Sequence, residues 1–443
     1  MVVISAVVLL FVLMFLNVPV YTSLIASALD YFINSDVNTI ILVQKMARGL
    51  SSTTLLAIPF FICAGILMNS SGIADRLFDF CKVILGRMPG ALAQVNVLLS
   101  TLMGGMSGSN IADAAMQSKM VFPQMIKGGY DAPFSAAVTA ASSLITPIIP
   151  PGIGLITFGY LGNVSVGRLF MAGILPGVLM CVVMMIFVHF ISLKNGYLPI
   201  RKTKATMREI GHASKSAVSA IVMPVIIIGG IRLGIFSATE AGSVAIVYAI
   251  VVGFLFYKSL TVKSLVQALR DTVVSTTNVA IIFASATAFS WFITNERIPQ
   301  AISDWVITSI NNPTIFLLAV IGLLLICGCF MDGGALQVIL VPLLLPAARA
   351  LGINEVHFGI IYILTSAIGT LTPPLGTVMF TVCNITGVGT RDFVKAEIPF
   401  YICLIICFRR SRCCFRIWFT ACNDDVPQKC AAQGGNHEYC RKD

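Results

Sequence analysis

Two short segments combine glycines with small polar side chains in a pattern that suits ion or carboxylate binding. The first reads GGMSGSNIADAA (104–115) and offers the hydroxyls of Ser107 and Ser109 and the amide of Asn110. Gly108 permits backbone conformations that point carbonyls or amides into a cavity. Asp113 follows within an apolar stretch, where an acid by default marks an ion or substrate path. These neutral oxygen donors predict a site for a hard monovalent cation or a carboxylate.

The second segment, GCFMDGGALQ (328–337), repeats this logic with one carboxylate beside small residues. Asp332 precedes the pair Gly333 and Gly334. Two unrelated loops would seldom share this composition, whereas two related ion sites would. We therefore expect two sites of common origin.

A pair of prolines lies near each candidate site. Proline cannot continue a helix, so Pro150-Pro151 and Pro373-Pro374 should leave backbone carbonyls unpaired. Within a bilayer such carbonyls are tolerated only where they line a cavity or bind something. Nearby hydroxyls and glycines complete the predicted sites: Thr146, Gly152, Thr370, Thr372 and Gly376.

The composition identifies the environment in which these residues act. Of 443 residues, 57% are apolar and 11% are charged, and the mean hydropathy is +0.92. At roughly 20 apolar residues per crossing, the chain can fill on the order of ten to twelve spans of a lipid bilayer. A soluble enzyme, a nucleic-acid-binding protein and a disulfide scaffold are excluded. We interpret the segment that starts at Met1 as a membrane helix and not as a signal peptide.

The chain contains an internal repeat at an offset of about 223 residues. This offset aligns the two Pro-Pro pairs, and it aligns the two polar segments, which we expect to form the tips of two hairpins. Residues 1–200, with a hairpin at about 90–125, form the first unit. Residues 216–410, with a hairpin at about 312–350, form the second. Each unit is predicted to cross the membrane five times, an odd number, so the two must have opposite orientations. The expected fold is all-α and polytopic, with two inverted-topology repeats, each containing a re-entrant hairpin and a Pro-Pro-broken helix, as in secondary transporters.

Charge and capping signals add detail to this plan. The basic connector 194–215 should lie in the cytoplasm, which places the 295–311 connector outside. In the second unit, helices are expected at about 216–235 and 238–257, the latter opened by a capping box of Ser237 and Glu240. In the first unit, segments 1–16 and 18–34 should be separated by a tight turn at Asn17-Val18-Pro19, and the alternative is a single kinked helix.

Other chemistries find less support. Gly105-Met106-Ser107-Gly108 matches a G-x-S-G nucleophile pattern, but Asp332 replaces the serine in the related second tip, which argues against an intramembrane serine protease. Thirteen cysteines show no metal-site spacing. Residues 409–443 are polar, Cys-rich and interrupt the closing helix with arginines. We interpret them as an atypical tail that resembles out-of-frame translation, and the alternative is a genuine soluble extension.

Together these motifs resemble the large membrane subunit of tripartite ATP-independent periplasmic (TRAP) transporters over about residues 1–400. The resemblance rests on segments 57–77, 107–115, 147–153, 239–242, 330–332 and 372–376. The family usually has a serine where this chain has Gly152.

The resemblance implies sodium-coupled, elevator-type uptake of an organic anion across the bacterial inner membrane, without catalysis or a bound cofactor. Sodium ions are expected near Ser107, Asn110, Asp332 and Gly334. The implied partners are a small four-helix membrane subunit and a periplasmic substrate-binding protein. Expected substrates are dicarboxylates, sialic acid, keto acids or sugar acids, and the alternative is a stand-alone sodium–carboxylate symporter of the same superfamily.

Overall fold

The computed structural model describes residues 2–16, 18–35, 37–52, 55–201, 203, 205–310, 312–374 and 376–404. Within these ranges the chain is helical and contains no strand. The expectations for Asn17 and for the 409–443 tail lie outside the described residues.

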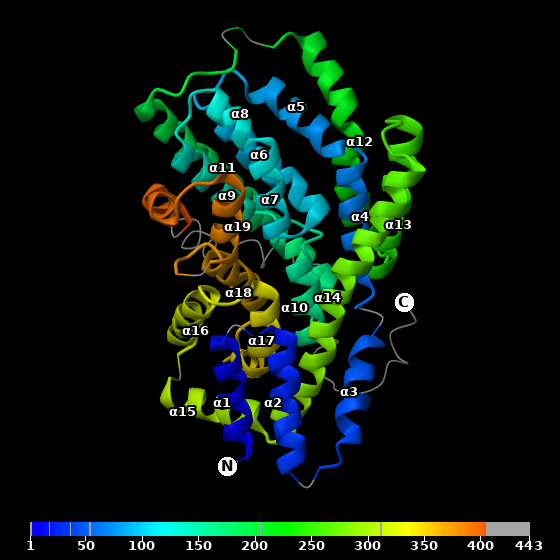
Figure 1. Ribbon diagram of the computed structural model, residues 1–443, viewed down its shortest axis with the longest axis vertical. Helices are drawn as coiled ribbons and strands as arrows, with labels where there is room; N and C mark the ends of the chain where they lie inside the picture. The colour runs from blue at the N-terminus through cyan, green and yellow to red at the C-terminus, as the bar shows by residue number, and fades with distance from the viewer. Residues whose placement is uncertain are drawn as a thin grey trace, which may run out of the picture.

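The described residues of the first half form eleven helices, most of which are labelled in Figure 1. They are α1 (Val2–Phe15), α2 (Val20–Asn34), α3 (Ile40–Leu50), α4 (Ala57–Ser70), α5 (Ile73–Leu85), α6 (Ala91–Ser107), α7 (Asn110–Met120), α8 (Phe122–Lys127), α9 (Ala132–Ser143), α10 (Ile153–Gly162) and α11 (Val166–Asn195).

The second half follows with α12 (Met207–Arg232), α13 (Ala238–Val251), the π-helical turn η1 (Val252–Phe256), α14 (Val262–Asn295), α15 (Ile298–Ser309), α16 (Pro313–Gly328), α17 (Gly333–Ala350), α18 (Glu355–Gly369) and α19 (Thr377–Thr386). Residues 390–404 are also helical.

Local signals explain several helix ends. The capping box that opens α13 is confirmed, because the Glu240 amide donates to Ser237 Oγ (3.3 Å) and the Ser237 amide donates to Glu240 Oε2 (2.7 Å). In contrast, α12 begins at Met207 and not near residue 216, because Thr206 and Glu209 form another capping box. The basic connector is therefore confined to 196–206. The Thr206 amide donates to Glu209 Oε2 (2.9 Å), and Arg201 forms an ion pair with the same oxygen (3.1 Å).

The described helices match a multi-pass membrane protein. Four are long and apolar enough to cross a bilayer, and the bent pair α4–α5 together with the bent α12 raises the number to six. This is fewer than the ten to twelve spans suggested by composition, since much of the apolar sequence lies in shorter helices such as α6, α10, α16, α18 and α19. Hairpins and broken helices divide apolar sequence into pieces shorter than one span.

The packing of helices follows the same plan in both halves. In the first, α6 and α7 contact α9; in the second, α16 and α17 contact α18. The helix after each break contacts the hairpin of the other half: α10 packs on α17, and α19 packs on α7. One difference is that α3 and α4 are separate helices, whereas their counterparts are fused in the 34-residue α14. The assignment of 1–200 and 216–410 as inverted units remains a prediction that this packing pattern favours.

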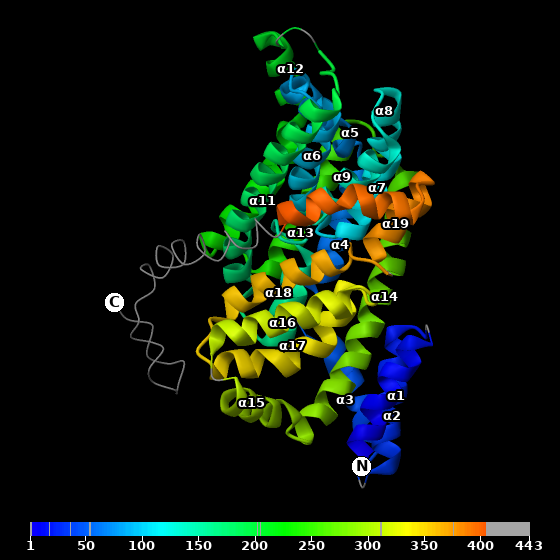
Figure 2. The same ribbon diagram turned by 90° about the vertical axis from the view of Figure 1, so that its left-hand side faces the viewer.

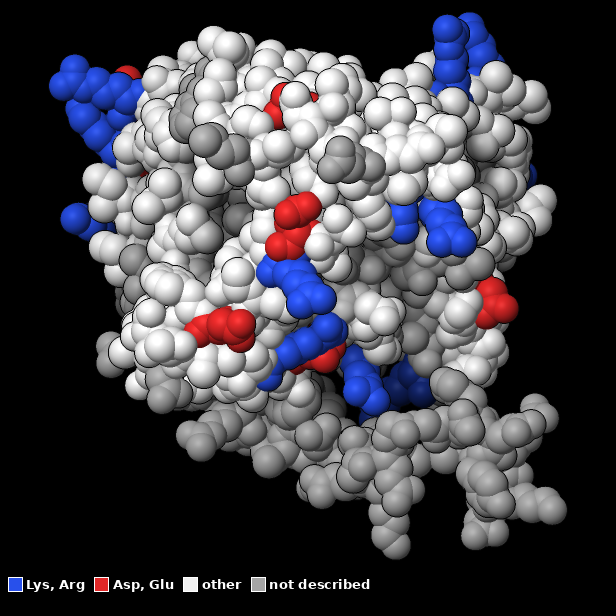
Figure 3. Space-filling view, turned by 90° about the horizontal axis from the view of Figure 1, so that it is seen from below, with Lys and Arg blue, Asp and Glu red and all other residues white. Residues whose placement is uncertain are grey.

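Figures 1 and 2 show the connector between α11 and α12 at one end of the long axis and α15 at the other, with α14 running along this axis between them. Seen from the α15 end, the surface is mostly uncharged, with acidic and basic groups intermixed (Figure 3). The opposite end carries the basic connector.

We predict that the two ends face opposite sides of the membrane. In intact cells, a membrane-impermeant thiol reagent should label Gln300→Cys but label Thr203→Cys only after the membrane is opened, because both positions are exposed in the structure. The unmodified chain supplies the background from native cysteines. Labelling of both variants from the same side would contradict the inverted repeat.

Candidate functional site

The first hairpin tip is a tight turn locked to the first Pro-Pro break. Gly108 has a φ of +60°, a conformation that L side chains rarely adopt. Its carbonyl accepts the amide hydrogen of Ile153 at the start of α10 (3.2 Å). A Cβ at Gly108 would lie 2.7 Å from the Pro151 carbonyl oxygen, so only glycine allows this approach. Ser109 caps α7 by accepting the Ala112 amide (3.4 Å).

The second tip brings Asp332 to the start of α17. Its carboxylate accepts the Gly334 amide (3.1 Å) and so caps this helix. Behind the tip, α16 approaches α18 closely at Gly328 and Gly369, where a Cβ added to either residue would lie within 3 Å of the other. In the first half, Gly104 likewise allows a close approach: a Cβ there would lie 2.8 Å from the Cβ of Ile149 and 3.3 Å from the Cα of Thr146, next to the first Pro-Pro break.

Both helix breaks have the same backbone form. The Pro150-Pro151 and Pro373-Pro374 peptide bonds are both cis. Each break ends at a glycine that faces a carbonyl: a Cβ would lie 2.2 Å from Pro147 O at Gly152 and 2.6 Å from Thr370 O at Gly376. Any side chain at position 152 therefore requires a shifted backbone in this chain.

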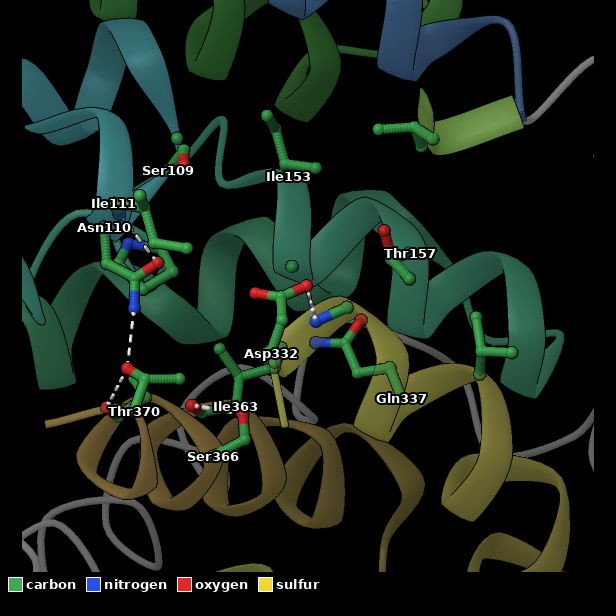
Figure 4. Close-up of a pocket in the computed structure, with 18 of the residues that line it drawn as sticks. Ser109, Asn110, Ile111, Ile153, Thr157, Asp332, Gln337, Ile363, Ser366 and Thr370 are labelled. Carbon is green, nitrogen blue, oxygen red and sulfur yellow. Dashed lines mark hydrogen bonds between the residues drawn. The ribbon is translucent and has the colours of Figure 1, made fainter. Parts of the chain in front are cut away.

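The tips and breaks surround a cavity of about 300 Å³. Its walls come from α7, α10, α14, α17 and α18, as Figure 4 shows in part. Seven of the predicted site residues line it: Gly108, Ser109, Asn110, Asp332, Gly333, Gly334 and Thr370. Asn110 Nδ2 donates to Thr370 Oγ1 (3.1 Å) across the cavity wall and joins the first tip to the second break (Figure 4).

The other predicted site residues lie behind this lining, and their roles as ligands remain predictions. They are Ser107, Asp113, Thr146, Pro150, Pro151, Gly152, Thr372, Pro373, Pro374 and Gly376. Two of their hydroxyls bond within their own segment: Ser107 to Met103 O (3.5 Å) and Thr372 to Ile368 O (2.9 Å). The Ser107 hydroxyl thus donates to a backbone carbonyl and not to a histidine.

Asp113 belongs to a buried polar network that joins the first hairpin to the helix before the break. Its Oδ2 atom accepts hydrogen bonds from Ser100 (2.7 Å), Gln117 (2.9 Å) and Thr146 (3.1 Å). Asp113 is 1% exposed, so this network fixes α6, α7 and the break relative to one another rather than facing the cavity.

Three polar residues that were not predicted from the sequence also line the cavity: Thr157, Gln337 and Ser366. Helical spacing provides a signal for two of them, because Ser366 lies four residues before Thr370 and Gln337 lies four after Gly333. The apolar wall of Val279, Ile282 and Phe283 on α14 was not predicted either.

The donor set of this cavity suits a hard monovalent cation better than a transition metal. Hydroxyl, amide and single-carboxylate oxygens gather around it, and the described residues contain no cluster of three or more His, Cys, Asp or Glu that could hold a metal ion. Sodium coordination at Ser107, Asn110, Asp332 and Gly334 remains a prediction.

Two hairpin tips and two broken helices around one cavity define a multi-pass membrane transporter of the discontinuous-helix type. The chain matches the family described as the tripartite ATP-independent periplasmic transporter, DctM component, over residues 7–408, and belongs to this family. It is a permease component and not an enzyme.

Two relatives support this assignment, and one solved structure has a similar fold. The chain is 39% identical over 395 residues to the sialic acid TRAP transporter large permease protein SiaM of Vibrio cholerae (89% of this chain, 92% of the relative). It is 36% identical to the 2,3-diketo-L-gulonate TRAP transporter large permease protein YiaN of Escherichia coli (82% and 85%). Its fold resembles the YdaH transporter of Alcanivorax borkumensis, with a TM-score of 0.63 at 14% identity (88% and 90%).

We predict that Gly108→Ala abolishes most transport, because the added Cβ separates the first tip from Pro151 and Ile153. Gly196→Ala is the matched control: it has a similar φ of +72° but open space around the Cβ. Both should cost about 1–2 kcal/mol of backbone strain, and uptake in cells should fall only for the first. Equal losses would contradict a specific role for the tip contact.

For Asp113, we predict that Asp113→Ala lowers stability by about 1–3 kcal/mol, since it leaves buried donors without an acceptor. Asp113→Asn retains an acceptor oxygen and should lose less. Thermal unfolding of the purified proteins in detergent measures both. An alanine variant as stable as the parent would show that the network does not hold the hairpin.

Proposed function

We propose that this chain carries out secondary uptake of an organic acid across the bacterial inner membrane, coupled to sodium. The supporting observation is the charge of the cavity. Among its described lining residues, Asp332 is the only charged side chain, and there is no Lys, Arg or His. An organic anion beside this carboxylate needs cations bound with it, because like charges at close range repel strongly in a low dielectric.

The polar groups of the cavity suit such a substrate once cations are bound. Ser109, Asn110 and Gln337 supply hydroxyl and amide groups, which can bond to a carboxylate and to sugar hydroxyls. The α14 wall is apolar and would cover the less polar side of the substrate. The two tips would hold sodium ions on either side of the substrate, and an elevator-like movement of tips and breaks would carry the site across the membrane.

The relatives indicate the substrate class and the partners. SiaM is named for sialic acid and YiaN for 2,3-diketo-L-gulonate, and both names describe organic acids. As a large permease subunit, the chain would work with a small membrane subunit and a periplasmic binding protein that delivers the substrate.

The test is sodium dependence in proteoliposomes that contain the chain, its small subunit and its binding protein, with sialic acid and 2,3-diketo-L-gulonate as probes. Asp332→Asn should raise the half-saturating sodium concentration by about tenfold or more, since losing a charged ligand costs at least about 1.4 kcal/mol. The control is Asp304→Asn, an exposed acid on α15 outside the cavity. Sodium dependence that is unchanged by Asp332→Asn would refute the proposed ion site.

A further inference from the structure

The helical segment 390–404 carries an acid, Glu397, on its buried face, where an apolar residue is expected. Phe393, Glu397, Phe400 and Leu404 recur at helical spacing and are all buried, at 1% exposure or less. The opposite side carries Ile398 and Ile402, which are about half exposed, at 54% and 51%. Glu397 therefore lies on the inner face of a helix whose outer face suits lipid.

The Glu397 carboxyl group is fully buried, and neither oxygen has a hydrogen-bond partner among the residues that the structure describes. No ion pair joins it to a described Lys or Arg. Asp113 differs, because three donors converge on one of its oxygens. One oxygen of Asp113 is thus satisfied by hydrogen bonds and only its Oδ1 atom has no partner among the described residues, whereas both oxygens of Glu397 have none.

The internal repeat shows that packing does not require this acid. At the offset of 223 residues, Phe393 corresponds to the buried Phe170, and Glu397 corresponds to Ile174 on α11. A partly buried isoleucine occupies the equivalent position in the first half. The carboxyl group at position 397 therefore needs an explanation other than helix packing.

The titratable groups around Glu397 are few. On α19, Cys383 lies near enough to interact with it electrostatically. The second break has no titratable residue, and neither does α9, which contacts the segment through Phe134 and Phe400. On the segment itself, Arg391, Asp392 and Lys395 are exposed, Cys403 is buried and Tyr401 is half-buried. Cys329 of the second tip interacts with Tyr401.

A proton is the ligand that this environment favours. An unpaired carboxylate in an apolar interior costs several kcal/mol, and sodium requires several oxygen ligands, whereas a proton requires one. We propose that Glu397 binds a proton inside the membrane and exchanges it during the transport cycle. The exchange rests on the proposed transport function; the binding of the proton does not.

One contact connects this group to the cavity. Tyr401, one turn after Glu397, donates its hydroxyl hydrogen to the Leu371 carbonyl (2.9 Å). The neighbouring Thr370 lines the cavity and accepts the Asn110 amide. A rearrangement of the second break during transport therefore moves the surroundings of Glu397 and can release its proton.

Proton binding is tested by infrared difference spectroscopy on the full chain with its small subunit in lipid. The carbonyl band of a protonated carboxyl group should be lost on alkalinisation, the ratio of the two forms changing about tenfold per pH unit, and should be missing in Glu397→Gln and Glu397→Ile. The isoleucine variant copies Ile174 and should keep its membrane level and thermal stability. The proposal is overturned if no band depends on Glu397, if the band is constant between about pH 5 and about 9, or if sodium at fixed pH removes it.

Exchange is tested by the initial rate of uptake against pH at a fixed sodium gradient. The unmodified chain should show a pH dependence that Glu397→Gln, which mimics the protonated form, removes. The same pH profile in both would overturn the exchange. If neither probe acid is taken up at any pH, the proposed substrate class fails, whereas the infrared result still decides whether Glu397 binds a proton.

Discussion

The requirement that most constrains this molecule is to satisfy backbone groups at helix ends inside a membrane, where no bulk water is available. Four such ends meet at the cavity: two hairpin tips and two Pro-Pro breaks. The structure meets part of this requirement by contact between them, as when the Gly108 carbonyl accepts the Ile153 amide and the Thr370 carbonyl accepts the Val378 amide (3.0 Å).

The need for close approach explains why glycine recurs in these segments. A Cβ at Gly104, Gly108 or Gly152 would collide with the first break, and Gly328 and Gly369 restrict the second half in the same way. The exchange of partners, with α10 on the second hairpin and α19 on the first, makes the two halves interdependent. The cavity therefore exists only when both halves are folded against each other.

Much of this arrangement could be predicted from sequence, because its signals are local. Proline pairs, glycine-rich tips and the Ser237–Glu240 capping box each depend on a few neighbouring residues. The start of α12 was missed although Thr206 and Glu209 also form a capping box, since the basic charge of the region suggested a loop. The lining role of α14 was not predictable in this way: Val279, Ile282 and Phe283 are ordinary apolar residues, and only tertiary packing brings them to the cavity. Conversely, Asp113 attracted attention as an acid in an apolar segment, but its hydrogen-bond partners could be found only from the fold.

The length of α14, compared with the thickness of a bilayer, indicates how the molecule lies in the membrane. At 1.5 Å per residue, its 34 residues extend about 51 Å, whereas the hydrocarbon core of a bilayer is about 30 Å thick. Hiding the whole helix in the core would need a tilt of more than about 50°, beyond the usual range of up to about 40°. Its ends must therefore emerge into water, and Lys263, Arg270 and Asp271 near the first end are compatible with this. The cavity-lining residues 279–283 begin about 26 Å from that end. This distance is about half the length of the helix, so the cavity lies close to the middle of the membrane.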